Sequence, residues 1–395
     1  MIKKLLYTLP LLTMALCSCC GNAQEKLVLG DERFGQYIPL LEGRRVAVFS
    51  NQTGLVGGGE EHILDALIGK GINVTAIFSP EHGFRGTASD GAKIADDRDP
   101  ATGVPILSLY GGAGGNRPTA KAMDSFDVLV ADIQDVGLRF YTYYITLCNL
   151  MDACGEAGKK LVLLDRPNPN GHYVDGPVLD MSLRSGVGRL PIPTVHGLTL
   201  GELALMAKGE GWLGAGNDCD ITVIPCLGYT HHTFYELPVR PSPNLPNMLS
   251  IYLYPSMCGF EGTPVSLGRG THKPFQQYGH PAFKGTYSYS FTPHSLQGAV
   301  NPPLKDITCY GVDLSGMSLD EARSKGLDLS YIIDAYNLMP KKDGFFREFF
   351  DKLMGRTYVR EMIEAGASAE EISAMWKKDV EEFKILRRQY LLYEE

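Results

Sequence analysis

The stretch INVTAIFSPEHGFRG, residues 72–86, decides how this chain of 395 residues is expected to fold. Residues 72–78 form a continuous run of mostly apolar and β-branched side chains, which is typical of a parallel strand covered on both faces. The run then stops, and Glu81, His82 and Arg85 follow within a turn that contains proline and glycine. Ionisable groups directly after a buried strand point to the carboxyl edge of a sheet, where open α/β folds bind ligands.

Similar runs recur along the first half of the chain, with helical patterns between them. The predicted strands are 46–50, 72–78, 104–109, 127–132 and 160–165, and the predicted helices are 62–71, 121–126 and 142–156. Strands and helices that alternate at this spacing predict right-handed βαβ units. We therefore expect an α/β fold whose first domain has a Rossmann-like, doubly wound, mostly parallel sheet.

The second half of the chain has a different pattern. A helix at 198–208 and a strand at 221–224 precede a proline-rich, irregular segment at 229–246, after which helices dominate. This change predicts an N-terminal domain of residues 27–250 and a smaller α+β domain of residues 251–395.

Two capping boxes mark the starts of helices in this half. Thr199 with Glu202 should open the helix at 198–208, and Ser368 with Glu371 should open a long helix that runs to about Tyr390.

Residues 1–20 have the pattern of an export signal rather than of folded structure. Lys3 and Lys4 precede an apolar segment, 5–16, that is too short to span a bilayer as a mature helix. The following LCSCC resembles a bacterial lipoprotein processing box, with Cys19 as the acylated residue. The alternative is a plain secretory signal. Both predict export, and the first predicts a periplasmic or outer-membrane-anchored lipoprotein of a Gram-negative bacterium.

Several function classes are excluded by what the sequence lacks. The chain has a formal charge of −8, which disfavours nucleic acid as a partner. It has no G-x-G-x-x-G or Walker A turn, no H-E-x-x-H and no G-x-S-x-G, so we expect no cofactor, no metal and no acyl-transfer serine. Past residue 20 no C-x-x-C pair occurs, and buried free thiols are expected.

Polar side chains end nearly every predicted strand, and these ends should converge on one edge of the sheet. A helix cap or a loop salt bridge is the ordinary explanation for any single one. Taken together they predict a site. The candidates on this edge are Asn51, Glu81, His82, Arg85, Asp132, Gln134, Arg139, Tyr141 and Asp165.

A pair of carboxylates with tyrosine and arginine nearby suits glycoside hydrolysis, which needs one acid and one base or nucleophile. Glu81 is the first candidate, with His82 orienting it; alternatively Glu81 forms a salt bridge with Arg85. The stretch CGFEGTPVSLGRGTHKPFQ, residues 258–276, supplies the second. There Glu261 lies in a glycine-rich loop, as ligand-binding acids do, although a structural turn with a surface acid has the same pattern. The same loop contributes Arg269, Thr271 and His272.

Four motifs together resemble the bacterial exo-β-N-acetylmuramidases of the NamZ type, a family formerly known as a domain of unknown function. They are FSPEHGFRG (78–86), DIQDVGLRFYTY (132–143), LDRPNPNG (164–171) and FEGTPVSLGRGTHKPF (260–275), and the resemblance spans residues 27–395. It implies an exo-acting glycosidase that releases terminal N-acetylmuramic acid from the non-reducing ends of peptidoglycan fragments. It also implies an active site in the cleft between two domains.

The resemblance implies that Glu81 is the catalytic acid. Glu261 is the choice for the second carboxylate, and Asp132, Asp135 or Asp165 remains open as a replacement. An arginine would bind the lactyl carboxylate of N-acetylmuramic acid in a bidentate way. The motifs contain arginines at positions 85, 139 and 269. The partners implied are peptidoglycan-derived glycans and muropeptides.

A different class of protein uses many of the same residues. A lipid-anchored protein that binds muropeptides without cleaving them would need the arginines and tyrosines but would tolerate loss of Glu81. An exported esterase is a third class, for which the sequence shows no nucleophile.

Overall fold

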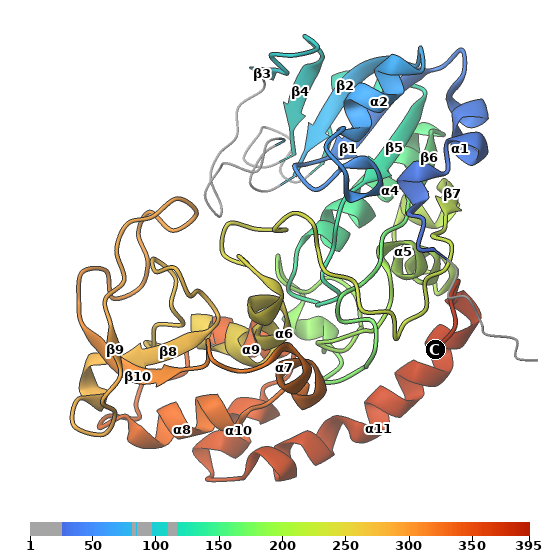
Figure 1. The fold of residues 1–395 in the computed structure, drawn as a ribbon. Helices are drawn as coiled ribbons and strands as arrows, with labels where there is room; N and C mark the ends of the chain where they lie inside the picture. The colour runs from blue at the N-terminus through green and yellow to red at the C-terminus, as the bar shows by residue number, and fades with distance from the viewer. Residues whose placement is uncertain (1–25, 81–83, 85–96, 110–116) are drawn as a thin grey trace, which may run out of the picture.

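The computed structural model describes residues 26–80, 84, 97–109 and 117–395 (Figure 1). Its N-terminal half contains a seven-stranded sheet in the order β3-β4-β2-β1-β5-β6-β7. The strands are β1 (Arg45–Ser50), β2 (Asn73–Ser79), β3 (Asp97–Arg98), β4 (Pro105–Ser108), β5 (Val128–Asp132), β6 (Lys160–Leu164) and β7 (Asp220–Ile224). All except β3 pair in parallel with their neighbours. The predicted Rossmann-like sheet is confirmed, and each strand expected from the sequence is present.

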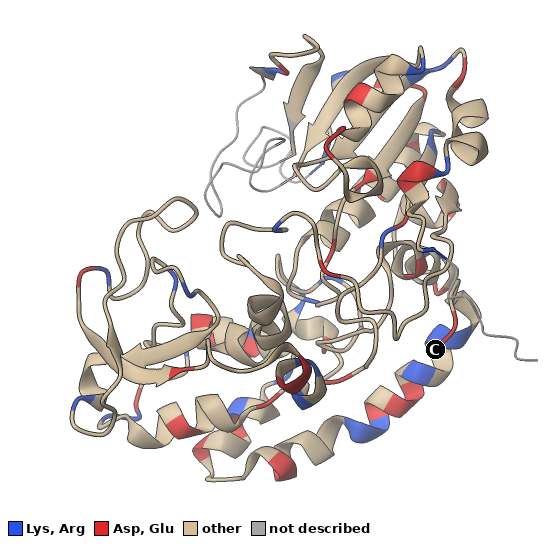
Figure 2. Cartoon of the chain, in the orientation of Figure 1, with Lys and Arg blue, Asp and Glu red and all other residues tan. Residues whose placement is uncertain are grey.

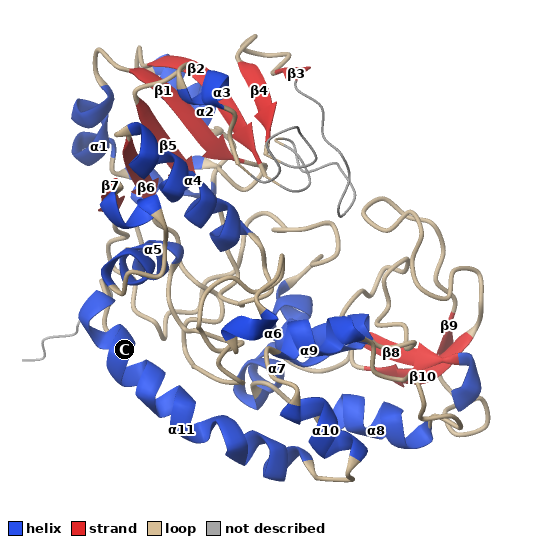
Figure 3. Cartoon of the chain, turned by 180° about the vertical axis from the view of Figure 1, so that it is seen from behind, coloured by secondary structure: helices blue, strands red, loops and turns tan. Residues whose placement is uncertain are grey.

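Helices cover both faces of this sheet, as a doubly wound fold requires. Alternate residues of β1 divide between two apolar clusters: Val46 and Val48 pack on one side, and Ala47 and Phe49 on the other. Helices α1 (Phe34–Leu41) and α2 (Ile63–Gly69) cover the first face. Helices α3 (Ala120–Met123), α4 (Tyr143–Ala157) and α5 (Leu200–Gly209) contribute to the cluster on the second face (Figure 3).

The C-terminal half is a smaller α+β unit. Its antiparallel sheet has the order β8-β10-β9, with β8 (Gln277–His280), β9 (Ser290–Phe291) and β10 (Cys309–Asp313). Its helices are α6 (Met248–Met257), α7 (Leu319–Lys325), α8 (Ser330–Leu338), α9 (Glu348–Met354), α10 (Tyr358–Glu364) and α11 (Ala369–Arg387). Helix α6 crosses residue 250, and one hydrophobic cluster runs through both halves. The boundary at 250 stays a prediction.

The local signals for helix ends are confirmed. Thr199 and Ser368 accept hydrogen bonds from the backbone N–H groups of Glu202 and Glu371, whose side chains accept in return from the two capping residues. Helix α11 ends at Arg387, and a 3₁₀ turn carries the chain to Tyr390. Acidic and basic residues follow one another along this helix (Figure 2).

The cysteines from residue 148 onward are buried free thiols, as predicted. In the part of the chain that the structure describes, no helix is both long and apolar enough to cross a bilayer.

The C-terminal segment that follows α11 returns to the N-terminal sheet. Tyr393 Oη donates to Asp165 Oδ2 over 2.7 Å and accepts from the backbone N–H of Cys226. The backbone N–H of Leu392 donates to Glu202, and the carbonyl of Glu394 accepts from the N–H of His231. Long-range hydrogen bonds thus join the last residues to the carboxyl edge of the sheet.

Replacing Tyr393 by phenylalanine removes this buried hydroxyl and leaves the Cys226 N–H without its partner. We expect Tyr393→Phe to lower the free energy of unfolding by about 1–3 kcal/mol, measured by urea denaturation. Tyr390→Phe is the matched control, because its hydroxyl donates to Glu210 nearer the surface. Equal effects of the two variants would contradict the structural importance assigned to the Tyr393 contact.

Candidate active site

The carboxyl ends of β1, β5 and β6 lie side by side in the sheet. Ser50 at the end of β1 pairs with Asp132 at the end of β5, and Asp165 directly follows β6. The strand order reverses between β1 and β5, which is the point where open α/β sheets bind their ligands. Of the polar residues predicted at the strand ends, Asn51, Asp132 and Asp165 therefore lie at this edge.

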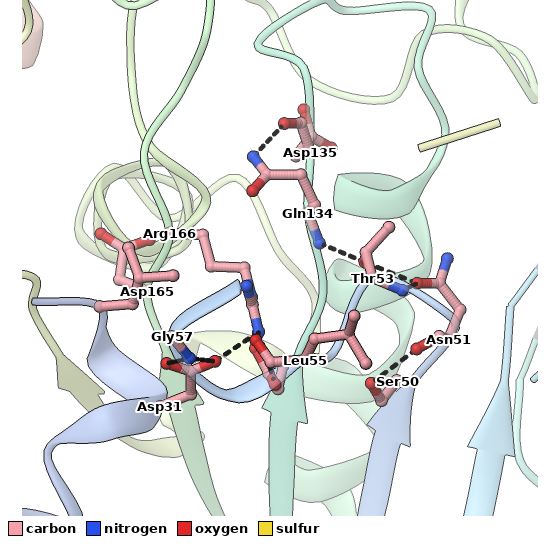
Figure 4. Close-up of polar contacts among 12 residues, drawn as sticks. Asp31, Ser50, Asn51, Thr53, Leu55, Gly57, Gln134, Asp135, Asp165 and Arg166 are labelled. Carbon is pink, nitrogen blue, oxygen red and sulfur yellow. Dashed lines mark hydrogen bonds and ion pairs between the residues drawn. The ribbon is translucent and has the colours of Figure 1, made fainter. Parts of the chain in front are cut away.

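The position between these strand ends is filled by Arg166 (Figure 4). Its Nε donates to Asp132 Oδ1 over 2.6 Å, and its Nη2 donates to Asp31 Oδ2 over 2.6 Å and to the carbonyl of Leu55. All three charged side chains are almost fully buried. Burial, followed by the charge of Asp132, raises the pKa of Asp31 to about 7 despite the attraction of Arg166. This crevice is occupied by the protein's own ion pairs.

Asp165, a further acid at this edge, also has its hydrogen bonds from groups of the protein itself. Asp165 accepts hydrogen bonds from Thr199 Oγ1 (2.6 Å), the Gly201 N–H (2.8 Å) and Tyr393 Oη. Burial raises its pKa to about 6. These contacts give Asp165 a structural role: it holds the start of α5 and the C-terminal segment in place.

The side chains of Gln134 and Arg139 likewise point into the protein and bind backbone carbonyls. Gln134 Nε2 donates to the carbonyls of Asp135 and Pro167. The side chain of Arg139 is 0% exposed and donates to the carbonyls of Pro177, Ile192 and Leu353. Burial lowers the pKa of Arg139 to about 10. Because Leu353 belongs to α9, this arginine joins the two halves of the chain instead of lining a hollow.

Tyr141 and Tyr143 lie between the sheet edge, where Asn51 binds Tyr143, and a hollow that both tyrosines line. Asn51, just after β1, donates through Nδ2 to Tyr143 Oη over 2.9 Å. Both tyrosine hydroxyls donate to the carbonyl of Pro241, and the ring centroids lie 4.7 Å apart. Asn51 therefore contributes by positioning an aromatic side chain.

The two tyrosines line a hollow of about 190 Å³, which we call the tyrosine hollow. Both halves of the chain contribute to its wall. The lining residues are Phe140, Tyr141, Thr142, Tyr143, Val187, Ser242, Asn244, Leu245, Tyr254, Glu261, Arg269 and Phe275.

Glu261 and Arg269 form the charged part of this wall. Glu261 lies in the 3₁₀ turn Cys258–Gly262 that follows α6, and its Oε1 accepts from Arg269 Nη2 (2.6 Å) and Nε (2.8 Å). Both side chains are about one-fifth exposed. The guanidinium also lies over the Phe275 ring, 5.2 Å from its centroid.

Phe275 supports this pair from a strained backbone. Its φ of 60° is in the left-handed region, which a residue with a bulky side chain rarely adopts and which costs on the order of 1–3 kcal/mol. The ring packs edge-on against Tyr254 at 4.6 Å between centroids. The loop thus holds an unfavourable conformation that places an aromatic ring beneath the arginine.

A second hollow of about 220 Å³ adjoins the first through Asn244. It contains two residues predicted from the sequence. Thr271 uses its hydroxyl inside the loop, donating to the Gly268 carbonyl and accepting from Gln277 Nε2, whereas His272 is exposed. Arg240 also lines this hollow.

Arg240, Ser242 and Asn244 line these hollows but are not among the residues predicted from the sequence. All three lie between prolines in the segment 239–246, which was interpreted only as irregular. Polar residues in a proline-rich loop were the available signal, since functional residues concentrate on loops held by a rigid scaffold.

Several predicted site residues lie outside the described residues: Cys19, Glu81, His82 and Arg85. Phe84, within the same motif as the last three, is described and is buried, with its ring edge-on to His62 at 4.8 Å. Within the described ranges, no three His, Cys, Asp or Glu side chains gather as a metal site would require.

Comparison with known proteins decides the family. The model described as exo-β-N-acetylmuramidase NamZ, N-terminal, matches residues 46–249, and its C-terminal counterpart matches residues 252–393. The chain belongs to the NamZ family. The resemblance inferred from the four motifs is thereby confirmed.

Relatives of known name or structure agree with this NamZ assignment. The peptidoglycan β-N-acetylmuramidase NamZ of Bacillus subtilis (strain 168) is 35% identical over an alignment 387 residues long, which covers 92% of this chain and 90% of the relative. A solved DUF1343 family protein from Bacteroides fragilis NCTC 9343 is 58% identical with a TM-score of 0.87, covering 94% of this chain and 99% of its own. A second from the same organism is 30% identical with a TM-score of 0.75, covering 93% and 99%.

Replacing Arg166 by leucine tests how much its buried ion pairs contribute to the free energy of unfolding. We expect Arg166→Leu to lower the free energy of unfolding by about 3–5 kcal/mol, because Asp31 and Asp132 would remain buried without their counter-charge. Urea denaturation at pH 7.5 measures the effect. The control is Arg45→Leu, which breaks an exposed ion pair with Asp127 and should change the urea midpoint little. If the urea midpoint of Arg166→Leu is close to that of Arg45→Leu, the buried ion pairs of Arg166 do not have the stabilising role assigned to them.

Proposed function

We propose that the protein is an exo-acting glycoside hydrolase that releases terminal, non-reducing β-N-acetylmuramic acid from peptidoglycan fragments. Membership of the NamZ family supports the reaction class, and the name of the B. subtilis relative supports the bond that is cleaved. The single structural observation that carries the proposal is the tyrosine hollow, where Glu261 lies beside aromatic rings in a recess built from both halves of the chain.

The wall of the tyrosine hollow suits an N-acetylated sugar acid. The side chains of Tyr141 and Tyr143, which are 7% and 1% exposed, form a rigid aromatic part of the wall beside the charged pair. Arg269 is the described arginine that lines this hollow, and a guanidinium is the group that best recognises a carboxylate such as the lactyl group. Arg139 is buried elsewhere and Arg85 lies outside the described residues, so among the described candidates we assign the lactyl contact to Arg269.

The two carboxylates take different roles in this proposal. Arg269 lies 2.6 Å from Glu261 and stabilises negative charge there, which suits a base, a nucleophile or a group that stabilises the oxocarbenium-like transition state. Glu81, identified from its motif, takes the complementary role of the acid that protonates the leaving oxygen. His82 remains the residue predicted from the sequence to orient Glu81.

We also propose that the protein is exported and anchored by lipid on Cys19, which places it in the periplasm or on the outer membrane. The support is the basic, apolar and cysteine-containing pattern of residues 1–20. Its substrates would then be the glycans and muropeptides released during turnover of the cell wall.

Release of sugar from a chromogenic β-N-acetylmuraminide tests the reaction, with the matching N-acetylglucosaminide as the specificity control. We expect cleavage of the muraminide, and a loss of about 100-fold or more in kcat for Glu261→Gln with this substrate and for Glu81→Gln with a disaccharide whose leaving sugar must be protonated, the scale of acid–base contributions. The loss for Glu81→Gln should be smaller with a good leaving group such as nitrophenol, because that group needs less protonation.

Glu156→Gln is the matched control for Glu261→Gln, because it also removes the charge of a glutamate paired with an arginine, Arg117, but on the surface. It should leave kcat unchanged. Full activity of Glu261→Gln would remove Glu261 from the mechanism. If the wild type binds the muraminide and releases nothing, the protein is a muropeptide-binding protein and not a hydrolase.

Incorporation of labelled palmitate in a bacterial host tests the anchor. We expect the full-length protein to carry the label, Cys19→Ser to lose it, and Cys17→Ser to retain it. An exported but unlabelled wild-type protein would show that residues 1–20 are a plain secretory signal.

A further inference from the structure

A third recess also borders the Glu261–Arg269 pair. Its volume is about 470 Å³, within the range of about 300–1,000 Å³ that is usual for ligand sites. We call it the phenylalanine hollow. It is lined by Phe260, Glu261, Thr263, Val265, Leu267, Arg269, Gly298, Ala299, Val300, Asn301, Pro302, Pro303 and Phe349.

Two residues belong to both recesses. Glu261 and Arg269 line the tyrosine hollow and also the phenylalanine hollow, so the carboxylate borders both spaces. A glycosidase must hold a sugar on each side of the bond that it cleaves, with its carboxylates next to that bond. The shared position of Glu261 matches this requirement.

The wall of the phenylalanine hollow is mostly apolar, and apolar surface is exposed at its mouth. Phe349 is 38% exposed and Val300 is 51% exposed, although both are large hydrophobic side chains. Among the described lining residues, the charged ones are Glu261 and Arg269, which are paired with each other. Such a wall favours a ligand that is neutral and has an apolar face.

Phe349 is held at a set place relative to Glu261. Gly262, the next residue after Glu261, lets the backbone of α9 approach closely: a Cβ atom there would lie 2.5 Å from the backbone N and Cα of Phe350. The N–H of Arg347 donates to the carbonyl of Gly262 over 2.8 Å. The backbone segments that carry Phe349 and Glu261 are therefore packed directly against each other, which suits a subsite next to the scissile bond.

We propose that the phenylalanine hollow is the subsite for the leaving sugar, a neutral N-acetylhexosamine whose C–H face and acetamido methyl group pack against Phe349 and Val300. This inference rests on the proposed function, since it names the group on the other side of the cleaved bond. A peptide stem fits less well, because its carboxylates would call for lysine or arginine side chains in the wall.

Two substrates with equally poor leaving groups separate this subsite from the chemistry. One is the disaccharide of N-acetylmuramic acid β-linked to N-acetylglucosamine, and the other is methyl β-N-acetylmuraminide, which leaves the hollow empty. For Phe349→Ala we expect kcat/KM to fall about tenfold or more with the disaccharide, the scale of a lost apolar contact, and to stay within about twofold with the methyl glycoside. Val300→Ser should act in the same direction.

Phe234→Ala is the matched control, because Phe234 is 50% exposed and does not line the hollow. It should change neither rate. Equal losses with both substrates in Phe349→Ala, or no loss with either, would overturn the proposal. A loss confined to substrates that carry a peptide stem would also overturn it and would assign the hollow to the stem.

Failure of the proposed function gives a different result. If the wild type cleaves neither substrate, the glycosidase proposal fails. Binding of a sugar to the phenylalanine hollow then tests the subsite without any cleavage. Saturation-transfer NMR with methyl β-N-acetylglucosaminide as the probe should then show contact with the wild type and a weaker signal with Phe349→Ala. No signal with the wild type would overturn the subsite as well.

Discussion

The fold of the N-terminal half depends on the buried ion pairs that the guanidinium of Arg166 forms with Asp31 and Asp132. The guanidinium joins the end of β5, through Asp132, to the turn Gly30–Glu32 before α1, through Asp31, and it also holds the carbonyl of Leu55. Taking three charges out of water is costly unless each is paired, so the three segments must come together for the sheet edge to be stable.

This arrangement also determines where the site lies. In a Rossmann fold the crevice at the reversal of strand order receives the ligand. Here Arg166 fills that crevice, and the acids at the strand ends bind groups of the protein itself. The open recesses lie further out, where Tyr141 and Tyr143 meet the loop that carries Glu261 and Arg269. The sheet edge acts on the site indirectly, through the hydrogen bond from Asn51 to Tyr143.

A site built from two halves of a chain needs them to be held together. Arg139 reaches the carbonyl of Leu353 in α9 from the N-terminal half, and Tyr393 returns from the C-terminal end to Asp165. These two buried contacts explain why residues with strongly polar side chains occur in motifs near the site without lining it. A motif shared with a family therefore contains residues that bind and residues that support, and sequence position does not separate them.

The sequence by itself determined the parallel sheet, the capping boxes of α5 and α11 and the family, because strand runs, caps and long motifs are local patterns. It also indicated Glu261 and Arg269 as site candidates, and the structure places both in the wall of one hollow. Only the tertiary structure decided that Arg166 fills the sheet crevice, that Arg139 and Asp165 are buried supports, and that Asn244 lines two recesses. Those outcomes depend on which residues distant in sequence come into contact and on how much water remains around each charge, and neither follows from local sequence.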